Sequence, residues 1–247
     1  MITYLDRAAA SDAGRRYKND LLAALDVRSG DVVLDVGCGP GTDLGALADA
    51  VGTDGTDGTV IGVDIDPAML DRARRRTADR STVEIRAGDA HALPLPDASV
   101  DRARVDRVLM HLADPPRVLA ELRRVVRPGG RVALAEPDWH TLVIDDVDTA
   151  TSTAYTDYVT TAVVRNAAIG RRLGRLLADA GFAPSVRATA VGYDDYVTAE
   201  AVLRMPAVAE RGWRSGALDE HATRAWLDRL ARGPFLAAFT LFTAIGS

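Results

Sequence analysis

The chain has 247 residues, of which 47% are hydrophobic, so it can bury a full core as one α/β domain with an additional segment. Its formal net charge of −5 argues against a nucleic-acid-binding surface. The N-terminus has no apolar signal core, no apolar run approaches about 18 residues, and the single cysteine, Cys38, fits a reducing compartment. We therefore expect a cytoplasmic protein that neither binds nucleic acid nor enters a membrane.

Strands alternate with helices through the first half of the chain. Residues 1–29 are expected to form N-terminal helices, with clear helical spacing over 12–27. Buried strands are expected at residues 32–36, 60–63, 83–86, 101–108 and 131–136. Helices are expected to begin at Thr42 or Asp43, at Asp66-Pro67 and at Asp114-Pro115, with Pro128-Gly129-Gly130 ending the last of them. This alternation predicts a parallel sheet with helices on both faces.

Two arginines oppose the assignment of residues 101–108 as a central strand. Arg102 and Arg104 fall where a parallel strand buried on both faces should be apolar. Neither composition nor spacing explains these two side chains. We therefore hypothesise that Arg102 and Arg104 pair with nearby acidic residues.

The pattern changes after residue 136. Residues 147–180 are expected to be mostly helix, and two further strands are expected at 184–192 and 235–245. If the sixth strand is parallel and the last is antiparallel, their connection emerges at the carboxyl ends of the strands, where ligands of open α/β sheets bind. We therefore divide the chain into a core, residues 1–195 and 234–247, and a helical lid inserted between strands 6 and 7, residues 196–233.

The loop after the first strand is rich in glycine. Gly37, Gly39 and Gly41 have no Cβ, so the backbone can turn sharply and approach a ligand closely. A dinucleotide fingerprint would need glycine where this chain has Thr42, and the lysine of a P-loop is missing. Asp35, inside the end of the strand, would repel a pyrophosphate and attract a cation. Taken alone, such a loop is weak evidence for a ligand site, because some loops of this kind are only tight turns from strand to helix.

Acidic residues follow three consecutive strands. Asp35, Asp64 and Asp89 stand at the ends of the first, second and third predicted strands. Each one by itself is explained as a helix cap or a solvated loop residue. Together they converge on one edge of the sheet, beside the glycine loop, because parallel strands end at the same edge.

These motifs, taken in order, resemble the class I S-adenosylmethionine-dependent methyltransferases, and most closely the small-molecule branch typified by enzymes of ubiquinone and menaquinone biosynthesis (methyltransferase type 11). The resemblance covers about residues 30–140 and rests on Val-Leu-Asp-Val-Gly-Cys-Gly-Pro-Gly, Gly-Val-Asp-Ile-Asp-Pro, Gly-Asp-Ala, His-Leu-x-Asp-Pro and Arg-Pro-Gly-Gly. It implies a three-layer Rossmann-like α/β sandwich whose seven-stranded sheet is mostly parallel, with an antiparallel last strand.

The resemblance also implies S-adenosylmethionine as cofactor and the residues that hold it. Asp64 would accept hydrogen bonds from both ribose hydroxyls, because a carboxylate can take two from a diol. The other residues implied for the adenosine part are Ile65, Met69, Gly88, Asp89 and Ala90. Those implied for the methionine part are Asp35, Gly37, Cys38, Gly39, Gly41, Val105 and Asp106.

Two histidines lie on the predicted ligand edge. His111 follows strand 4 and His140 follows strand 5, and either could act as general base toward a hydroxyl acceptor. The alternatives are that His111 caps the next helix or packs under the loop, and that His140 is only solvated. Candidates for the acceptor pocket are Trp139, Tyr155 and Trp213, all of which also suit core or lid packing. No clustered set of carboxylates suggests a metal.

The expected function is methyl transfer by in-line displacement to a small, fairly apolar metabolite of secondary or quinone-type metabolism. Oxygen is the acceptor atom that we expect first. The alternative is an enzyme of the same fold that catalyses a cyclisation or rearrangement with the cofactor structural. A nucleic-acid or protein methyltransferase is disfavoured by the acidic charge and by Val-Asp-Arg-Val, which stands where Asn/Asp-Pro-Pro-Tyr/Phe would mark a base-amine enzyme. The state of assembly is left open between monomer and homodimer.

Overall fold

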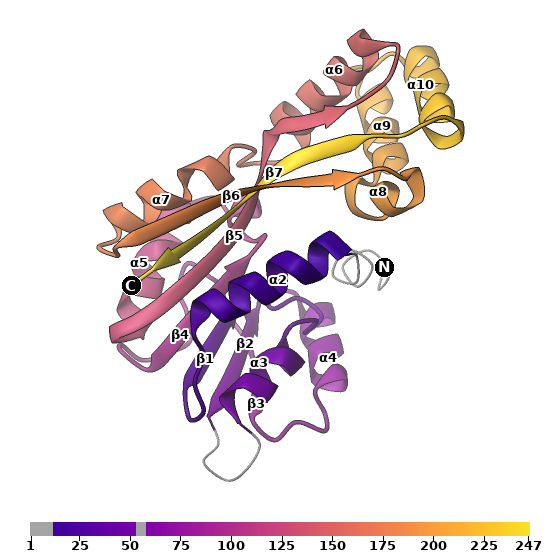
Figure 1. Cartoon of the computed structure of the whole chain (residues 1–247). Coiled ribbons are helices and arrows are strands. Elements are labelled where there is room, and N and C mark those ends of the chain that lie inside the picture. The colour runs from indigo at the N-terminus through magenta and orange to yellow at the C-terminus, as the bar shows by residue number, and fades with distance from the viewer. Residues whose placement is uncertain (1–11, 53–57) are drawn as a thin grey trace.

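A seven-stranded sheet forms the centre of the computed structural model, which describes residues 12–52 and 58–247 (Figure 1). The strand order is β3-β2-β1-β4-β5-β7-β6, and β7 is antiparallel to both of its neighbours while the other pairs are parallel. The strands are β1 (Val32–Val36), β2 (Thr59–Asp64), β3 (Val83–Ala87), β4 (Val100–Asp106), β5 (Val126–Ile144), β6 (Pro184–Tyr193) and β7 (Ala237–Gly246). The predicted fold class, a mostly parallel α/β sandwich with an antiparallel last strand, is confirmed.

Helices cover both faces of the sheet, because successive strand residues point to opposite sides. Val33 packs into one buried cluster, against residues of α2 (Asp12–Leu25), α3 (Leu44–Val51) and α4 (Pro67–Arg76). Leu34 packs into the other, against α5 (Pro115–Val125) and α7 (Ile169–Asp179). The sheet therefore forms the middle of three layers. The expected N-terminal helices are described only from α2 onward, and residues 1–11 lie outside the described residues.

Aspartates begin two of these helices as predicted. The side chain of Asp66 accepts a hydrogen bond from the backbone N–H of Ala68, and Asp114 accepts one from Arg117. A proline follows each of them at the first helical turn, where its missing N–H is not needed. Asp43 precedes α3 without making such a bond, and its carboxylate is used elsewhere in the molecule.

The fifth strand is much longer than the predicted residues 131–136. It begins directly after α5, so Pro128-Gly129-Gly130 lies within the strand, and it continues to Ile144. Beyond Glu136 it stays in the sheet by pairing with β7, with a register shift between Asp138 and Val143. The partner strand lies about a hundred residues away in the chain, so local sequence could not predict the extension.

A group of helices lies at the C-terminal ends of β5 and β6 and at the N-terminal end of β7 (Figure 1). It contains α6 (Thr149–Tyr158), the π-helix η2 (Val159–Val163), α8 (Tyr196–Leu203), α9 (Met205–Arg214) and α10 (Glu220–Arg232). We call it the helical group. The helix expected over 147–180 is thus two helices, and its first half packs with the inserted ones. No helix among residues 12–52 and 58–247 has both the length and the apolar character needed to cross a bilayer.

Ion pairs and backbone carbonyls account for the arginines of β4, as hypothesised. The Nε of Arg102 donates to the backbone oxygen of Asp26 at 3.0 Å and lies 3.6 Å from Oδ2 of Asp31. Arg104 is surrounded by three carboxylates beneath the glycine loop. The two arginines of a strand that breaks the apolar rule are therefore paired with groups from β1, from neighbouring loops and from β4 itself.

Candidate active site

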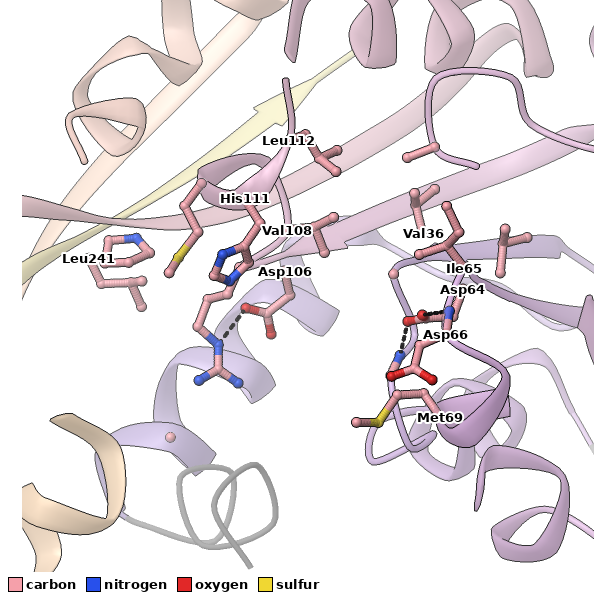
Figure 2. A pocket seen from close by; sticks show the side chains of 18 of the residues that line it. Val36, Asp64, Ile65, Asp66, Met69, Asp106, Val108, His111, Leu112 and Leu241 are labelled. Atoms are coloured by element: carbon pink, nitrogen blue, oxygen red, sulfur yellow. Dashed lines mark hydrogen bonds and ion pairs between the residues drawn. The ribbon is translucent and has the colours of Figure 1, made fainter. Parts of the chain in front are cut away.

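A cavity of about 500 Å³ opens where the parallel strands end (Figure 2). One end is lined by carboxylates and glycines after β1, β2 and β3, and we call it the carboxylate end: Gly37, Gly39, Asp64, Ile65, Asp66, Met69, Gly88, Asp89 and Ala90. The other end is lined mainly from β5, β6 and β7, and we call it the apolar end: Pro137, Trp139, Val191, Tyr193, Val202, Phe239 and Leu241. Figure 2 shows Asp64, Ile65 and Met69 on one side of the cavity and Leu241 on the other, with His111 between them.

The glycine loop folds back over β2. Gly37 has a φ of +69°, and a Cβ added to it would lie 2.4 Å from Cγ2 of Val108, so both the backbone conformation and the space require glycine. The N–H groups of Gly37 and Cys38 donate to the carbonyl of Val63 at 2.7 and 3.0 Å. These bonds hold the loop against the end of β2, next to Asp64.

Asp64 is fixed by the loop that it faces. Its Oδ2 accepts a hydrogen bond from Gly39 N at 2.8 Å, and its Oδ1 accepts one from Asp66 N at 2.9 Å. Each carboxylate oxygen can accept a further bond, so the group can bind a vicinal diol without losing its own supports. The side chain lines the cavity, as the predicted contact with a ribose requires.

The loop after β3 is held by a histidine. Oδ1 of Asp89 accepts the backbone N–H of His91 at 2.9 Å and lies 2.7 Å from its Nδ1, and these bonds lower the pKa of Asp89. Ile65, on the other side, is 72% exposed although it is a large apolar residue. An apolar planar ring bound between the two loops would cover Ile65, so the residues present fit an adenine.

Beneath the glycine loop lies a buried ion cluster around Arg104. This guanidinium is 4% exposed and lies 3.3 Å from Asp35 Oδ1, 2.8 Å from Asp43 Oδ2 and 2.6 Å from Asp106 Oδ2. Lys18 of α2 contacts Asp43 and Asp106 as well. We call these five residues the Arg104 cluster.

The cluster changes the role expected for Asp35. Burial raises the pKa of Asp35 to about 6 while Arg104 opposes the shift, so the pair is charged at neutral pH. Although burial opposes it, the positive charge of Arg104 holds the pKa of Asp106 well below its usual range. Asp106 lines the cavity, whereas Asp35 and Cys38 line only a neighbouring hollow of about 60 Å³.

His111 lies between the two ends of the cavity. It closes the short 3-10 helix η1 (Leu109–His111), which follows β4 after Arg107 and Val108. Desolvation of the ring within the cavity, together with the positive charge of Arg107, lowers the pKa of His111. The imidazole is therefore neutral near pH 7 and able to accept a proton.

The apolar end has aromatic walls. The rings of Trp139 and Phe239 have centroids 5.1 Å apart, and those of Tyr193 and Phe239 are 6.4 Å apart. Sequence reasoning missed Tyr193, Leu241 and the valines of β6 and α8. One indication was visible in the sequence. Phe239 and Leu241 are two residues apart in β7, so their side chains point to the same face of the sheet.

Several residues predicted for the site lie outside the cavity. His140 is exposed and its N–H donates to Asp138. Tyr155 is 1% exposed because it packs against Trp226, with ring centroids 4.9 Å apart in the helical group. The others that do not line the cavity are Asp35, Cys38, Gly41, Val105 and Trp213. Among residues 12–52 and 58–247, no group of three or more His, Cys, Asp or Glu side chains is arranged to hold a metal ion.

Comparison with known proteins agrees with this site. Residues 34–134 match the family model described as a methyltransferase domain. The chain is 51% identical over 245 residues to an uncharacterized 37.1 kDa protein in transposon TN4556 of Streptomyces fradiae, covering 99% of this chain and 70% of that protein. It is 36% identical over 135 residues to demethylmenaquinone methyltransferase of Symbiobacterium thermophilum, covering 53% of each chain.

The fold is similar to that of solved structures. The YcgJ protein of Bacillus subtilis superposes with a TM-score of 0.66 at 16% identity, covering 94% of this chain and 97% of that one, which is a likeness of fold. The chain spans about half the length of the demethylmenaquinone methyltransferases that it matches. On these findings residues 34–134 of the chain form a methyltransferase domain, in agreement with the family that the sequence motifs resemble.

Proposed function

We propose that this protein transfers a methyl group to a hydroxyl of a small, largely apolar metabolite. The observation that carries the proposal is the division of one cavity into a carboxylate end and an apolar end, with His111 between them. The first end suits a cationic nucleoside and the second suits an apolar acceptor. The reacting atoms would then meet beside a neutral imidazole.

The carboxylate end would hold the cofactor through Asp64 on the ribose, Asp89 near the adenine amino group, and the backbone of Gly37 and Gly39 along the methionine part. When bound, S-adenosylmethionine supplies a methyl group on a sulfonium, which is already activated for in-line displacement. The protein therefore has two remaining tasks, which are to align the acceptor and to keep water away. Orientation alone contributes up to about 7–11 kcal/mol in favourable cases.

The apolar end would hold the acceptor. Trp139, Tyr193 and Phe239 offer large apolar surfaces for a flat or hydrophobic molecule. His111 would accept the hydroxyl proton as the oxygen attacks, a contribution of roughly 10²–10⁴-fold. Because its pKa is lowered, the ring is in the required neutral form at neutral pH.

Residues 196–233 would cover this end as a lid. Val202 of α8 lines the cavity beside side chains from β6 and β7. The inserted helices pack on α6, with Trp226 donating a hydrogen bond to Ser152 Oγ at 2.9 Å. The lid would thus be the helical group as a whole, including α6, and its part in the reaction would be to exclude water.

An acceptor screen tests the proposal. The protein is incubated with S-adenosylmethionine and a panel of phenols, hydroquinones and amines, and both S-adenosylhomocysteine and methylated product are measured. We expect O-methylated product in step with S-adenosylhomocysteine, and a His111→Gln variant that is slower by about 10²–10⁴-fold. His140→Gln is the matched control and should keep the full rate. Full activity of His111→Gln would exclude the base, and an acceptor converted without S-adenosylhomocysteine would exclude methyl transfer.

A further inference from the structure

The turn that carries His111 has an unfavourable start. We call residues 108–112 the His111 turn; Val108, Met110, His111 and Leu112 of this segment all line the cavity. The residue just before it, Arg107, has a φ of +56°, in the left-handed region that L residues rarely adopt. Such a conformation persists only when the surrounding structure holds it in place. The contacts of the turn show what holds it.

A buried carboxyl group binds the beginning of the turn. Oε1 of Glu136, in β5, accepts the backbone N–H groups of Val108 at 2.8 Å and Leu109 at 2.6 Å. The side chain is fully buried. Among the described residues no group hydrogen-bonds its second oxygen, Oε2. A carboxyl group placed there for the stability of the sheet alone would be costly, because a buried polar atom without a partner is destabilising.

An amide binds the end of the same turn. Nδ2 of Asn166 donates to the carbonyl of Leu109 at 2.8 Å and to that of Leu112 at 2.7 Å. The backbone N–H of Asn166 donates to the carbonyl of Met110 at 3.1 Å. Asn166 therefore binds three carbonyls of the turn, as Glu136 binds the N–H groups at the other end.

Glu136 and Asn166, which bind the two ends of the His111 turn, are themselves linked through β5. Asn166 lies in the segment between η2 and α7, and the next residue, Ala167, accepts the N–H of Trp139 at 2.8 Å. A Cβ on Gly170 would come within 2.7 Å of the backbone oxygen of Glu136, so the segment lies directly against the strand. The acceptor wall and the His111 turn are thus fixed to the same few residues.

We propose that Glu136 and Asn166 are positioning residues that hold the His111 turn from both ends and so set the place of the imidazole relative to the two ends of the cavity. Neither side chain is required to touch the substrate. The inference rests on the proposed function for its catalytic meaning, since it supports the group proposed as base. Its physical content, the placement of His111, is measurable without any acceptor.

Histidine NMR on the full chain tests the inference. The four histidines, His91, His111, His140 and His221, give few ring signals, and His111→Gln assigns the one of interest. Spectra are recorded with and without S-adenosylhomocysteine. In Asn166→Ala we expect the His111 signal to shift and its pKa to rise toward the ordinary value of an imidazole, because the freed ring is better hydrated. The other histidines should not change.

Conservative and matched variants separate placement from folding. Glu136→Ala should move the His111 signal as Asn166→Ala does, whereas Glu136→Gln, which keeps an oxygen for the two N–H groups, should leave it near that of the wild type. Ser152→Ala removes the buried acceptor of Trp226 and should not affect His111. Folded Asn166→Ala and Glu136→Ala proteins with an unchanged His111 signal would overturn the inference.

Hydrogen exchange in the wild type keeps the inference testable if the variants do not fold. The amides of Val108 and Leu109 should exchange slowly, and exchange as fast as in an exposed loop would contradict their capture by Glu136. Failure of the proposed function has a different signature. If the wild-type protein binds no S-adenosylmethionine or methylates no acceptor, the proposed function is wrong. The shift of the His111 NMR signal in Asn166→Ala would still support the positioning role.

Discussion

The two ends of the cavity are built in different ways. At the carboxylate end, Gly37 directly follows β1 and Asp64 is the last residue of β2, and their supports are backbone groups a few residues away or in the adjacent loop. At the apolar end, Trp139, Tyr193 and Phe239 come from strands that meet only in the folded sheet. The first end depends on local geometry and buried charge, and the second depends on long-range strand pairing and apolar packing.

This difference implies that the two ends respond separately to mutation. Substitutions among the acidic residues should change the affinity for the cofactor or the stability of the core. Substitutions among the aromatic residues should change only the KM for the acceptor. Single substitutions at each end test that separation.

The largest effect is expected for the Arg104 cluster, beneath the carboxylate end. Arg104→Met leaves the carboxylates of Asp35, Asp43 and Asp106 without their central cation, and unpaired buried charges are strongly destabilising. We expect a loss of about 3–5 kcal/mol in the free energy of unfolding, measured by urea denaturation. Arg86→Met, which breaks an exposed pair with Glu84, is the control and should cost less than about 1 kcal/mol. Equal effects would show that the cluster does not stabilise the core.

Cofactor affinity should depend most on Asp64. Asp64→Ala removes a charged acceptor of two hydrogen bonds to the ribose and the support of Gly39, so the dissociation constant for S-adenosylhomocysteine should rise about 100-fold or more by calorimetry. Asp114→Ala removes a helix-capping aspartate outside the carboxylate end and is the matched control. An Asp64→Ala protein with wild-type affinity would contradict the ribose assignment.

Stability should depend on pH through Glu136, whose buried carboxyl group binds the beginning of the His111 turn. Burial, with a smaller contribution from the charge of Asp106, raises the pKa of Glu136 to about 8, while the N–H groups of Leu109 and Val108 oppose the shift. Between about pH 5 and pH 8 the folded protein therefore binds a proton that the unfolded chain has lost, so this contribution to stability falls as pH rises, by roughly 1 kcal/mol per pH unit.

Glu136→Gln isolates this contribution. The variant cannot titrate at this position, so its free energy of unfolding should fall less steeply than that of the wild type over the same pH range, measured by urea denaturation at several pH values. Glu121→Gln, which removes a carboxylate whose pKa is lowered by hydrogen bonding to Arg124, is the control. Parallel curves for the wild type and Glu136→Gln would show that the carboxyl group titrates normally.

The smallest effect is expected where the two ends are most independent. Phe239→Ala removes a wall of the apolar end but no atom near Asp64, so the affinity for S-adenosylhomocysteine should stay within about twofold of the wild-type value. For any acceptor found by the screen, KM should rise about tenfold or more from the lost apolar contact. A large loss of cofactor affinity in Phe239→Ala would mean that the cavity does not divide as described.

The same contrast explains how far the sequence could predict the site. Asp64 and Asp89 were predictable because a residue that follows a parallel strand lies at the ligand edge wherever that strand sits in the sheet. Asp35 satisfied the same rule, yet Arg104 engages its carboxylate below the loop. Only the folded sheet brings these two side chains together.

The apolar end was not predictable for a related reason. The extension of β5 to Ile144 exists because β7 pairs with it, and neither strand contains a local signal for the other. Tyr155 was expected near the acceptor because it is aromatic, but it packs against Trp226 inside the helical group. Pairings over long sequence separations determine both outcomes.

A crystal structure of the protein with bound S-adenosylhomocysteine would show whether the cavity has two ends with separate ligands. We expect the ribose hydroxyls within hydrogen-bonding distance of both oxygens of Asp64, the adenine over Ile65, and the sulfur directed toward His111 and the apolar end. A nucleoside lying instead among Trp139 and Phe239 would contradict the division of the cavity into two ends.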